Sequence, residues 1–205
     1  MTEKILSINP PVSFYNKLFT DAECDYVIDN SENPYRFYKS GVYSAPGESI
    51  VDLNIRTSSS FFDEENLFHH IRNKAYETIK HKFEHIENFS IDHFEKCEVQ
   101  KYNPTEFVRP HNDYFERKLG VSGRIATLLI YLNDGFTGGD TRFNKLNIVI
   151  TPEKGSAIFF SYFPENDVIF KNALTLHESL PVLTGVKYVI TQWVREKPIL
   201  PGNRY

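Results

Sequence analysis

The second half of the chain, from about residue 95, is a series of short runs rich in β-branched and aromatic residues. The runs read KCEVQKYN, RIATLLIYLN, DTRFN, LNIVIT, SAIFFSYF, TLHESLPVL and VKYVITQWVRE. Turn-forming sequences such as NP, DG, TGGD, PEKG and LTG separate them. Runs of this kind predict β-strands, because branched and flat side chains pack well on a pleated surface. We therefore expect this half to form a β-sandwich or barrel.

Two helices are expected ahead of these strands. The first begins at Thr20, which can cap the segment TDAECDYVIDNSE and form a capping box with Glu23. The second covers DEENLFHHIRNKAYETIKHKFEHI, which has acidic residues in its first turn. Its apolar residues recur at helical spacing: Phe68, Ile71, Ala75, Ile79 and Phe83. This order of elements predicts a mainly β fold with helices packed on one outer face of the core.

The composition is that of an ordinary globular protein, with 205 residues, 40% hydrophobic and 24% charged. Because we find no linker and no low-complexity segment, we expect one domain over residues 1–205. Within it, about residues 1–94 should supply helical support and about residues 95–196 should form the core. The formal net charge is -4 and no basic stripe is present, so no nucleic-acid partner is expected.

Several features bear on the location of the protein. The sequence lacks an apolar run of about 18 residues that could span a membrane. The N-terminal sequence MTEKILSINPPVSF lacks the basic and then apolar regions of a signal peptide. The cysteines Cys24 and Cys97 lie far apart in the sequence and are expected to be buried free thiols. Together these features favour a cytoplasmic location under reducing conditions.

Among the seven histidines, His111 stands out because Asp113 follows it by two residues, between a loop and a strand pattern. In an extended segment these two side chains point to the same face. His177 is the only later histidine, and it would complete two imidazoles and one carboxylate, the facial triad of non-haem Fe(II) oxygenases. The alternative is a structural His–Asp pair. His85 and His93 also precede a glutamate by two residues, and we expect neither to bind a metal.

The second half also resembles a known family. The segments are YNPTEFVRPHNDYF, GRIATLLIYLNDGFTGGDTRFN, PEKGSAIFF and LHESLPVLTGVKYVITQWVRE. In this order they look like the prolyl 4-hydroxylase group of 2-oxoglutarate- and Fe(II)-dependent dioxygenases, over about residues 95–196. The segment NIRTSSSFF nearer the start also resembles this group. The resemblance implies a double-stranded β-helix, or jelly-roll, core with N-terminal supporting helices.

The resemblance assigns roles to individual residues. It places three of them at the iron positions: His111, Asp113 and His177. It places Lys187, counted with these three among the catalytic residues, against the far carboxylate of 2-oxoglutarate. This role is chemically reasonable, because an ammonium inside an apolar barrel needs an anionic partner. Tyr102 and Thr141 match residues beside the same carboxylate. The alternative for Lys187 is a surface lysine on an edge strand, and the alternative for Tyr102 and Thr141 is a hydrogen-bonded core residue.

For the substrate the resemblance is less complete. Arg124 and Trp193 match positions near the substrate, and a strand-end arginine and a core tryptophan are the alternatives. A tyrosine that faces the substrate in several prolyl hydroxylases is replaced here by Val108. Residues 36–50 and the loop 115–123 are expected to flank an open groove that leads past the iron.

The reaction implied is hydroxylation of a C–H bond, with 2-oxoglutarate converted to succinate and CO₂. C4 of a prolyl residue in a peptide or protein is the first expectation for the substrate. Another side chain, a free amino acid or a small metabolite is the alternative. From other classes, a non-catalytic jelly-roll binding module or a cupin-type hydrolase or isomerase would not need the lysine. The implied cofactors are Fe(II) and 2-oxoglutarate, with L-ascorbate as a further candidate.

Overall fold

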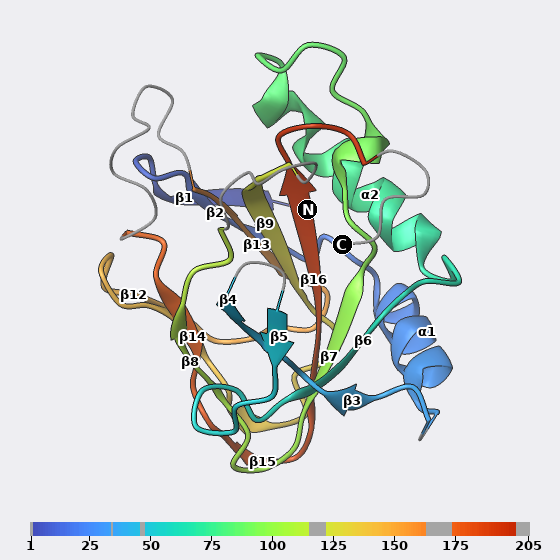
Figure 1. Cartoon of the computed structure of the whole chain (residues 1–205), viewed down its shortest axis with the longest axis vertical. Helices are drawn as coiled ribbons and strands as arrows, with labels where there is room; N and C mark the ends of the chain where they lie inside the picture. The colour runs from blue at the N-terminus through green and yellow to red at the C-terminus, as the bar shows by residue number, and fades with distance from the viewer. Residues whose placement is uncertain (1, 34, 46–47, 115–121, 163–173, 200–205) are drawn as a thin grey trace.

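The computed structural model describes residues 2–33, 35–45, 48–114, 122–162 and 174–199. Two antiparallel sheets form its centre (Figure 1). The larger contains, in spatial order, β1 (Thr2–Ser7), β2 (Val12–Asn16), β13 (Ala157–Ser161), β9 (Arg124–Tyr131), β16 (Lys187–Arg195), β7 (Glu98–Tyr102), β6 (Ser59–Phe62) and β3 (Tyr38–Lys39). The smaller contains β12 (Ile148–Ile150), β11 (Thr141–Phe143), β14 (His177–Ser179) and β8 (Val108–His111).

Two further strand pairs lie outside these sheets. Strand β10 (Thr137–Gly138) pairs with β15 (Val182–Thr184), and β4 (Val42–Ala45) pairs with β5 (Glu48–Ile50) in a hairpin. Each of the seven apolar runs in the second half of the sequence contains at least one strand. The expected mainly β fold is therefore confirmed.

The first expected helix is confirmed. Helix α1 (Asp21–Ser31) begins after Thr20, whose hydroxyl accepts the backbone N–H of Glu23 at 3.2 Å. The Glu23 carboxylate in turn accepts the backbone N–H of Thr20 at 2.7 Å, which completes the capping box.

The second helix begins later than the sequence suggested. Helix α2 (His69–Ile79) excludes the acidic residues at 63–65 and is followed by the 3₁₀ turns η1 (Lys80–Phe83) and η2 (Ile91–His93). The Asp63 carboxylate accepts the N–H groups of Leu67 and Phe68 at 2.8 and 2.7 Å, and thus acts before the helix. Asn66 has a left-handed φ of 58°, which prevents a continuous helix from starting at Asp63.

The first 94 residues are not helical support alone, which corrects that expectation. Strands β1 and β2 extend the large sheet beyond β13, and β6 and β3 extend its other edge. Within the described residues, none of the helices is long and apolar enough to cross a membrane. Both cysteines are free and buried, as expected.

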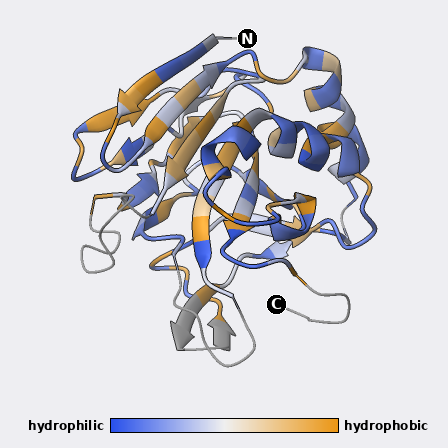
Figure 2. Cartoon of the chain, turned by 90° about the horizontal axis from the view of Figure 1, so that it is seen from above, coloured by the Kyte–Doolittle hydropathy of each residue, from blue (hydrophilic) through white to orange (hydrophobic). Residues whose placement is uncertain are grey.

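The large sheet is covered on both faces. Helices α1 and α2 lie on one face, and a cluster that includes Ile71, Ala75 and Ile190 packs between them and the strands. The small sheet lies toward the other face, where Tyr131 and Phe143 belong to a second cluster. Figure 2 shows the outer sides of the helices as mainly hydrophilic and the strands as richer in hydrophobic residues. Because of this double cover, all nine residues of β16 are buried.

Candidate active site

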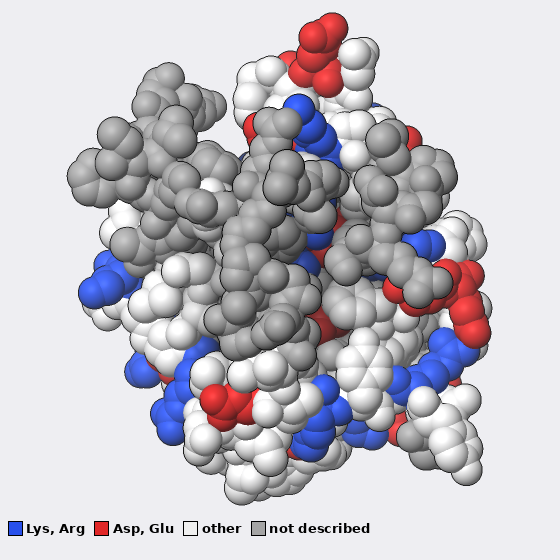
Figure 3. All heavy atoms as spheres, viewed as in Figure 1, with Lys and Arg blue, Asp and Glu red and all other residues white. Residues whose placement is uncertain are grey.

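A cavity of about 1040 Å³ lies between the two sheets. Its walls come from β3, β6, β7, β9, β13 and β16 of the large sheet, from β8, β11 and β14 of the small sheet, and from the β4–β5 hairpin. Figure 3 shows charged side chains, in blue and red, at the bottom of a hollow in this face of the molecule. Since strand side chains alternate between faces, the strands that build the apolar core also supply the cavity wall.

Strand pairing brings His111, Asp113 and His177 together. The two histidines are cross-strand partners in β8 and β14, and their ring centroids are 4.4 Å apart. Asp113 follows β8, with its Oδ1 at 3.5 Å from Nε2 of His111 and its Oδ2 at 3.8 Å from Nε2 of His177. The potential ligand atoms of all three lie within 4.8 Å of one another. In the part of the chain that the structure describes, no other such group of three is present.

Backbone carbonyl groups orient both imidazole rings. Nδ1 of His111 faces the carbonyl oxygen of Arg109 at 2.9 Å, and Nδ1 of His177 faces that of Thr175 at 3.0 Å. A carbonyl oxygen can only accept, so each Nδ1 carries the proton and donates. Each Nε2 then has a free lone pair on the side where the three residues meet, which is the arrangement typical of metal-binding histidines.

The charges of these groups suit a divalent metal. Burial alone would raise the pKa of Asp113, but the imidazoles of His177 and His111 outweigh it and hold that pKa well below its ordinary value. Burial, assisted by the nearby His111, lowers the pKa of His177 to about 4. An ionised carboxylate and a neutral imidazole are the protonation states that bind metals. Two imidazoles and one carboxylate are the donor set of non-haem Fe(II) sites. The residues present therefore fit Fe(II).

Lys187 presents a buried amino group to the same cavity. The residue is 1% exposed, and its Nζ donates to the carbonyl oxygen of Gly139 at 2.6 Å and to the Ser179 hydroxyl at 2.9 Å. Among the described residues, no carboxylate lies at ion-pair distance from it. Burial lowers the pKa of Lys187 to about 7. A buried ammonium held only by neutral acceptors is a suitable partner for the carboxylate of a ligand.

Tyr102 and Thr141, the two other residues predicted to contact 2-oxoglutarate, line the same cavity as this lysine. Tyr102 is the cross-strand partner of Lys187, with Nζ at 5.0 Å from the centre of its ring. Its hydroxyl donates to Oε1 of Gln100 at 2.7 Å. The Thr141 hydroxyl accepts from the hydroxyl of Tyr131 at 2.6 Å. Both predicted residues are buried and line the cavity.

Comparison with known proteins decides the family. Residues 97–195, from the residue before β7 to the end of β16, match the model of the 2OG-Fe(II) oxygenase superfamily. The chain belongs to this superfamily. The matched segment contains all the residues that the sequence predicts for the site.

Relatives in this superfamily include prolyl 4-hydroxylases. The chain is 28% identical to probable prolyl 4-hydroxylase 3 of Arabidopsis thaliana, over 93% of this chain and 71% of that protein. It is 29% identical to a putative prolyl 4-hydroxylase of Acanthamoeba polyphaga mimivirus, over 89% and 76% of the two chains. It is 25% identical to prolyl 4-hydroxylase subunit alpha-1 of Caenorhabditis elegans, but spans only 35% of that longer protein.

Solved structures confirm the jelly-roll fold. The 2OG complex of the viral collagen prolyl hydroxylase vCPH from Paramecium Bursaria Chlorella virus-1 superimposes with a TM-score of 0.65 at 27% identity. The match covers 90% of this chain and 94% of that chain. A Trichoplax adhaerens prolyl hydroxylase in complex with a hypoxia inducible factor peptide fragment has a TM-score of 0.69, at 18% identity, which supports the fold alone.

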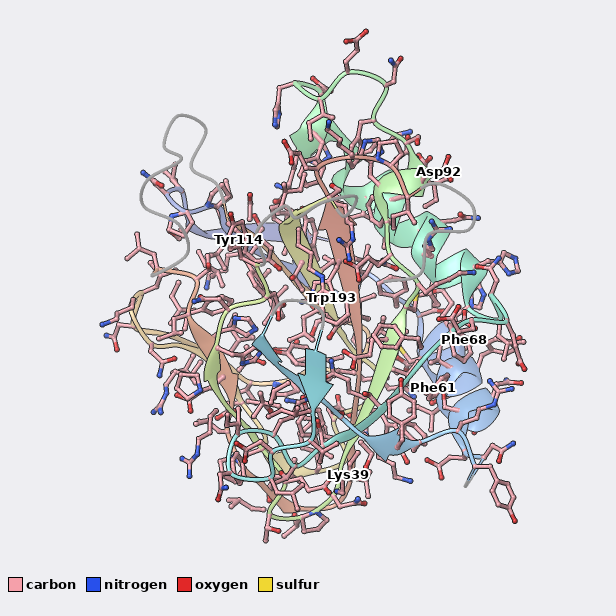
Figure 4. All side chains as sticks on the ribbon, viewed as in Figure 1. Lys39, Phe61, Phe68, Asp92, Tyr114 and Trp193 are labelled. Carbon is pink, nitrogen blue, oxygen red and sulfur yellow. The ribbon has the colours of Figure 1, made fainter. Side chains whose placement is uncertain are left out.

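In this member of the superfamily, Arg124 and Trp193 are in direct contact. Arg124 is 4% exposed, and its guanidinium lies 3.5 Å from the centre of the Trp193 ring. Two nitrogens of Arg124 also donate to the Glu95 carboxylate at 2.7 and 2.8 Å, so the arginine is a fixed part of the wall and not a surface residue. Trp193 lies near the centre of Figure 4, and its buried indole Nε1 has no hydrogen-bond partner among the described residues. That N–H is available to a ligand.

A further polar group of the cavity was missed by the sequence reasoning. Arg56 forms an ion pair with Glu98 at 3.2 Å, and Nε2 of Gln100 donates to Glu98 at 2.6 Å and to Thr191 at 2.8 Å. The alternation in EVQKY contained the necessary information, because Glu98, Gln100 and Tyr102 share one face of β7. Arg56 lies in the NIRTSSSFF segment, so its proximity to β7 depends on long-range pairing.

The expected groove walls are partly described. Of the segment 36–50, the described residues Tyr38, Val42 and Ile50 line the cavity. Residues 115–121 of the loop 115–123 lie outside the described residues. Val108, at the position of the absent tyrosine, is buried and also lines the cavity.

Proposed function

We propose that this chain is a 2-oxoglutarate- and Fe(II)-dependent dioxygenase that hydroxylates C4 of a prolyl residue in a peptide or protein, with release of succinate and CO₂. One observation carries the proposal. Three potential metal ligands and a buried lysine that has no carboxylate partner among the described residues face the same cavity, in a chain whose relatives include prolyl 4-hydroxylases. A non-catalytic binding module would need neither feature.

In this proposal the three residues with converging ligand atoms hold the metal: His111, Asp113 and His177. When bound, Fe(II) supplies the O₂ chemistry that oxidises the C–H bond while 2-oxoglutarate is decarboxylated. The protein holds the metal ligands in a fixed orientation. The carbonyl oxygens of Arg109 and Thr175 keep each Nε2 directed inward, and three protein ligands leave positions for cosubstrate and O₂.

Lys187 binds the far carboxylate of 2-oxoglutarate, with Tyr102 and Thr141 beside it. Among the described residues its ammonium has only the neutral acceptors Gly139 and Ser179, so a carboxylate supplies the missing negative charge. The pairing is strong because the lysine is 1% exposed and water cannot compete for it. The lysine thus sets the orientation of the cosubstrate relative to the triad.

Trp193 and Arg124 form the substrate side of the site. The free indole N–H of Trp193 is a suitable donor to a backbone carbonyl of the substrate. Arg124 holds the ring in place through its own ion pair with Glu95. Because Val108 offers no hydroxyl, this donor replaces part of what a substrate-facing tyrosine would contribute. We propose that the substrate enters past the β4–β5 hairpin, as an extended peptide.

The domain organisation, the cellular compartment and an accessory reductant are also part of the proposal. We propose that the whole chain acts as one domain, because strands from both halves join the same sheet. Two free buried thiols are consistent with work in a reducing compartment such as the cytoplasm. L-ascorbate is proposed as an accessory reductant through the family alone.

The test is incubation of the Fe(II)-loaded protein with 2-oxoglutarate and either proline-rich peptides, free proline or a cell extract. Mass spectrometry should show a gain of one oxygen on a peptide proline, and amino-acid analysis should show 4-hydroxyproline. Hydroxylation of free proline or a small metabolite, with none on peptides, would remove the prolyl-peptide substrate and leave the dioxygenase. Absence of succinate under all conditions would remove the dioxygenase itself.

A further inference from the structure

A hydroxyl group from the large sheet holds one oxygen of Asp113. Thr127 lies in the middle of β9, and its Oγ1 donates to Oδ2 of Asp113 at 2.8 Å. Thr127 is 1% exposed, and the side chain of Asp113 is 9% exposed. Hydrogen bonds to an ionised carboxylate are stronger than neutral ones, and burial removes competition from water. This bond therefore holds the Asp113 carboxylate, which follows β8 of the small sheet, against the large sheet.

A second hydroxyl group supports the first. The Tyr162 hydroxyl forms a short hydrogen bond with Oγ1 of Thr127, and Tyr162 is 1% exposed. An ionised carboxylate can only accept, and a threonine hydroxyl has one hydrogen. Thr127 therefore gives its hydrogen to Asp113, and Tyr162 must give its own to Thr127. The two hydroxyls form a chain of donors with a single direction, from Tyr162 to Asp113.

Resting on the metal site of the proposed function, we propose that Thr127 and Tyr162 are positioning residues that make Asp113 a one-oxygen metal ligand. Thr127 occupies Oδ2, so Oδ1 remains for the metal. The same bond fixes the rotation of the Asp113 carboxylate. This support matters because Asp113 follows the end of β8 and is not itself part of a strand. Residues that support a metal ligand in this way contribute to metal affinity although they do not touch the metal.

The chain offers matched variants for a test. Thr127→Val removes the hydroxyl and keeps the shape, whereas Thr127→Ser keeps the hydroxyl. Thr191→Val is the control, because Thr191 is also buried in the cavity wall but bonds to Gln100 and not to Asp113. Tyr162→Phe removes only the second hydroxyl. Its control is Tyr15→Phe, which removes a buried hydroxyl that donates to Glu3 at 3.0 Å.

The experiment measures Mn(II) affinity of the full chain, without cosubstrate, by the electron paramagnetic resonance of free Mn(II). Thr127→Val should weaken binding by about 10- to 100-fold. Thr127→Ser should restore most of that loss, and Tyr162→Phe should weaken binding by about two- to tenfold. The visible spectrum of the Co(II)-loaded protein should change in Thr127→Val, because a freed second oxygen can enter the coordination sphere, and it should be normal in Thr127→Ser.

Unchanged Mn(II) affinity in Thr127→Val, or an equal loss in Thr191→Val, would overturn the proposal and leave the hydroxyls a structural role. If Thr127→Val does not fold, Tyr162→Phe against Tyr15→Phe decides in the same way. A wild-type protein that binds no Mn(II) would overturn the metal site together with this inference. Tight Mn(II) binding that depends on Thr127, in a protein that forms no succinate, would keep the inference and overturn the proposed function.

Discussion

The large sheet separates two buried spaces that differ in chemistry. On the helix side, residues such as Val99, Leu128 and Ile190 form an apolar cluster. On the side of the small sheet, the same strands direct polar groups such as Gln100 and Lys187 into a cavity. The residues of both spaces are buried, but only burial of the apolar ones gains free energy. Burial of polar groups lowers stability, and the ligands proposed for the cavity explain why such groups are placed there.

Strand β16 shows this difference one residue at a time. Tyr188, Ile190 and Val194 belong to the helix-side cluster. Every second residue from Lys187 lines the cavity instead: Lys187, Val189, Thr191 and Trp193. Because all of them are buried, burial alone does not separate stability from function along this strand. Substitutions on the two faces should do so.

The largest effect is expected from the triad. His177→Ala should abolish measurable Mn(II) binding, since it removes a ligand, and losing only a supporting partner already costs about 10- to 100-fold. Stability of the metal-free protein should change little by comparison. A metal-binding titration followed by thermal unfolding checks both. The control is His85→Ala on the surface, and wild-type affinity in His177→Ala would contradict the site.

The next effect concerns the cosubstrate. Lys187→Ala should weaken 2-oxoglutarate binding by two to three decades, or about 3–5 kcal/mol, because the ligand carboxylate loses its buried partner. Lys187→Arg should restore only part, because the planar guanidinium needs a different space. Calorimetric titration of the Mn(II)-loaded protein measures this. The control is Lys101→Ala. Lys101 lies on the neighbouring strand β7, next to the cross-strand partner of Lys187, but it pairs with Glu32 on the outside of the protein, so this variant should bind 2-oxoglutarate as the wild type does.

A substitution on the helix-side face of β16 should lower stability and leave ligand affinity unchanged. Ile190→Ala removes a side chain that is 0% exposed from the apolar cluster, and should lower the free energy of unfolding by about 2–5 kcal/mol. The folded fraction should bind 2-oxoglutarate as the wild type does. Denaturant unfolding measures the change in stability, and ligand titration of the same sample measures the affinity for 2-oxoglutarate. Equal effects of Ile190→Ala and Lys187→Ala on ligand affinity would mean that the two faces are not functionally separate.

The pH dependence of binding should be moderate. Burial lowers the pKa of Lys187 to about 7, so the free protein increasingly loses this proton above that pH. A bound carboxylate favours the ammonium, so binding above this pH takes up a proton. Affinity for 2-oxoglutarate should therefore fall as pH rises above about 7, by at most about tenfold per pH unit, and level off below it. Calorimetry in buffers of different ionisation enthalpy detects the proton uptake, and constant affinity without uptake would contradict it.

The smallest effect is expected from Trp193→Phe, which removes the indole N–H. Because that N–H has no protein partner among the described residues, stability should change little. The KM for a peptide substrate should rise by about two- to tenfold, the value of one hydrogen bond. The KM for 2-oxoglutarate should stay the same, which is the internal control. An unchanged peptide KM would remove the indole from the substrate contacts.

Local patterns predicted much of this molecule. The capping box of Thr20 and Glu23 and the seven strand runs depend on neighbours in sequence, and both are confirmed. The start of α2 could not be predicted in the same way, because the Asp63 carboxylate can bond to N–H groups either within a helix or before one. Strands β1 and β2 become strands through pairing with each other and with β13, a distant partner that the local pattern does not reveal.

The site residues show the same difference between local patterns and long-range contacts. The spacing of His111 and Asp113 is local, and the structure brings both to His177. The residues that support them come from distant strands, and their contacts depend on register. Thr127 reaches Asp113 from the other sheet, and Arg124 meets Glu95 across 29 positions of sequence. The roles of these site residues stay predictions until ligands are bound.

The most direct test of this account is succinate formation from 2-oxoglutarate by the Fe(II)-loaded protein in air. The account predicts succinate from the wild type, faster with a prolyl peptide, none from His177→Ala, and normal formation by the folded fraction of Ile190→Ala. Lys187→Ala should need far more 2-oxoglutarate for the same rate. A folded, Fe(II)-loaded wild type that forms no succinate, or a His177→Ala variant that forms as much, would contradict the assignment of the cavity.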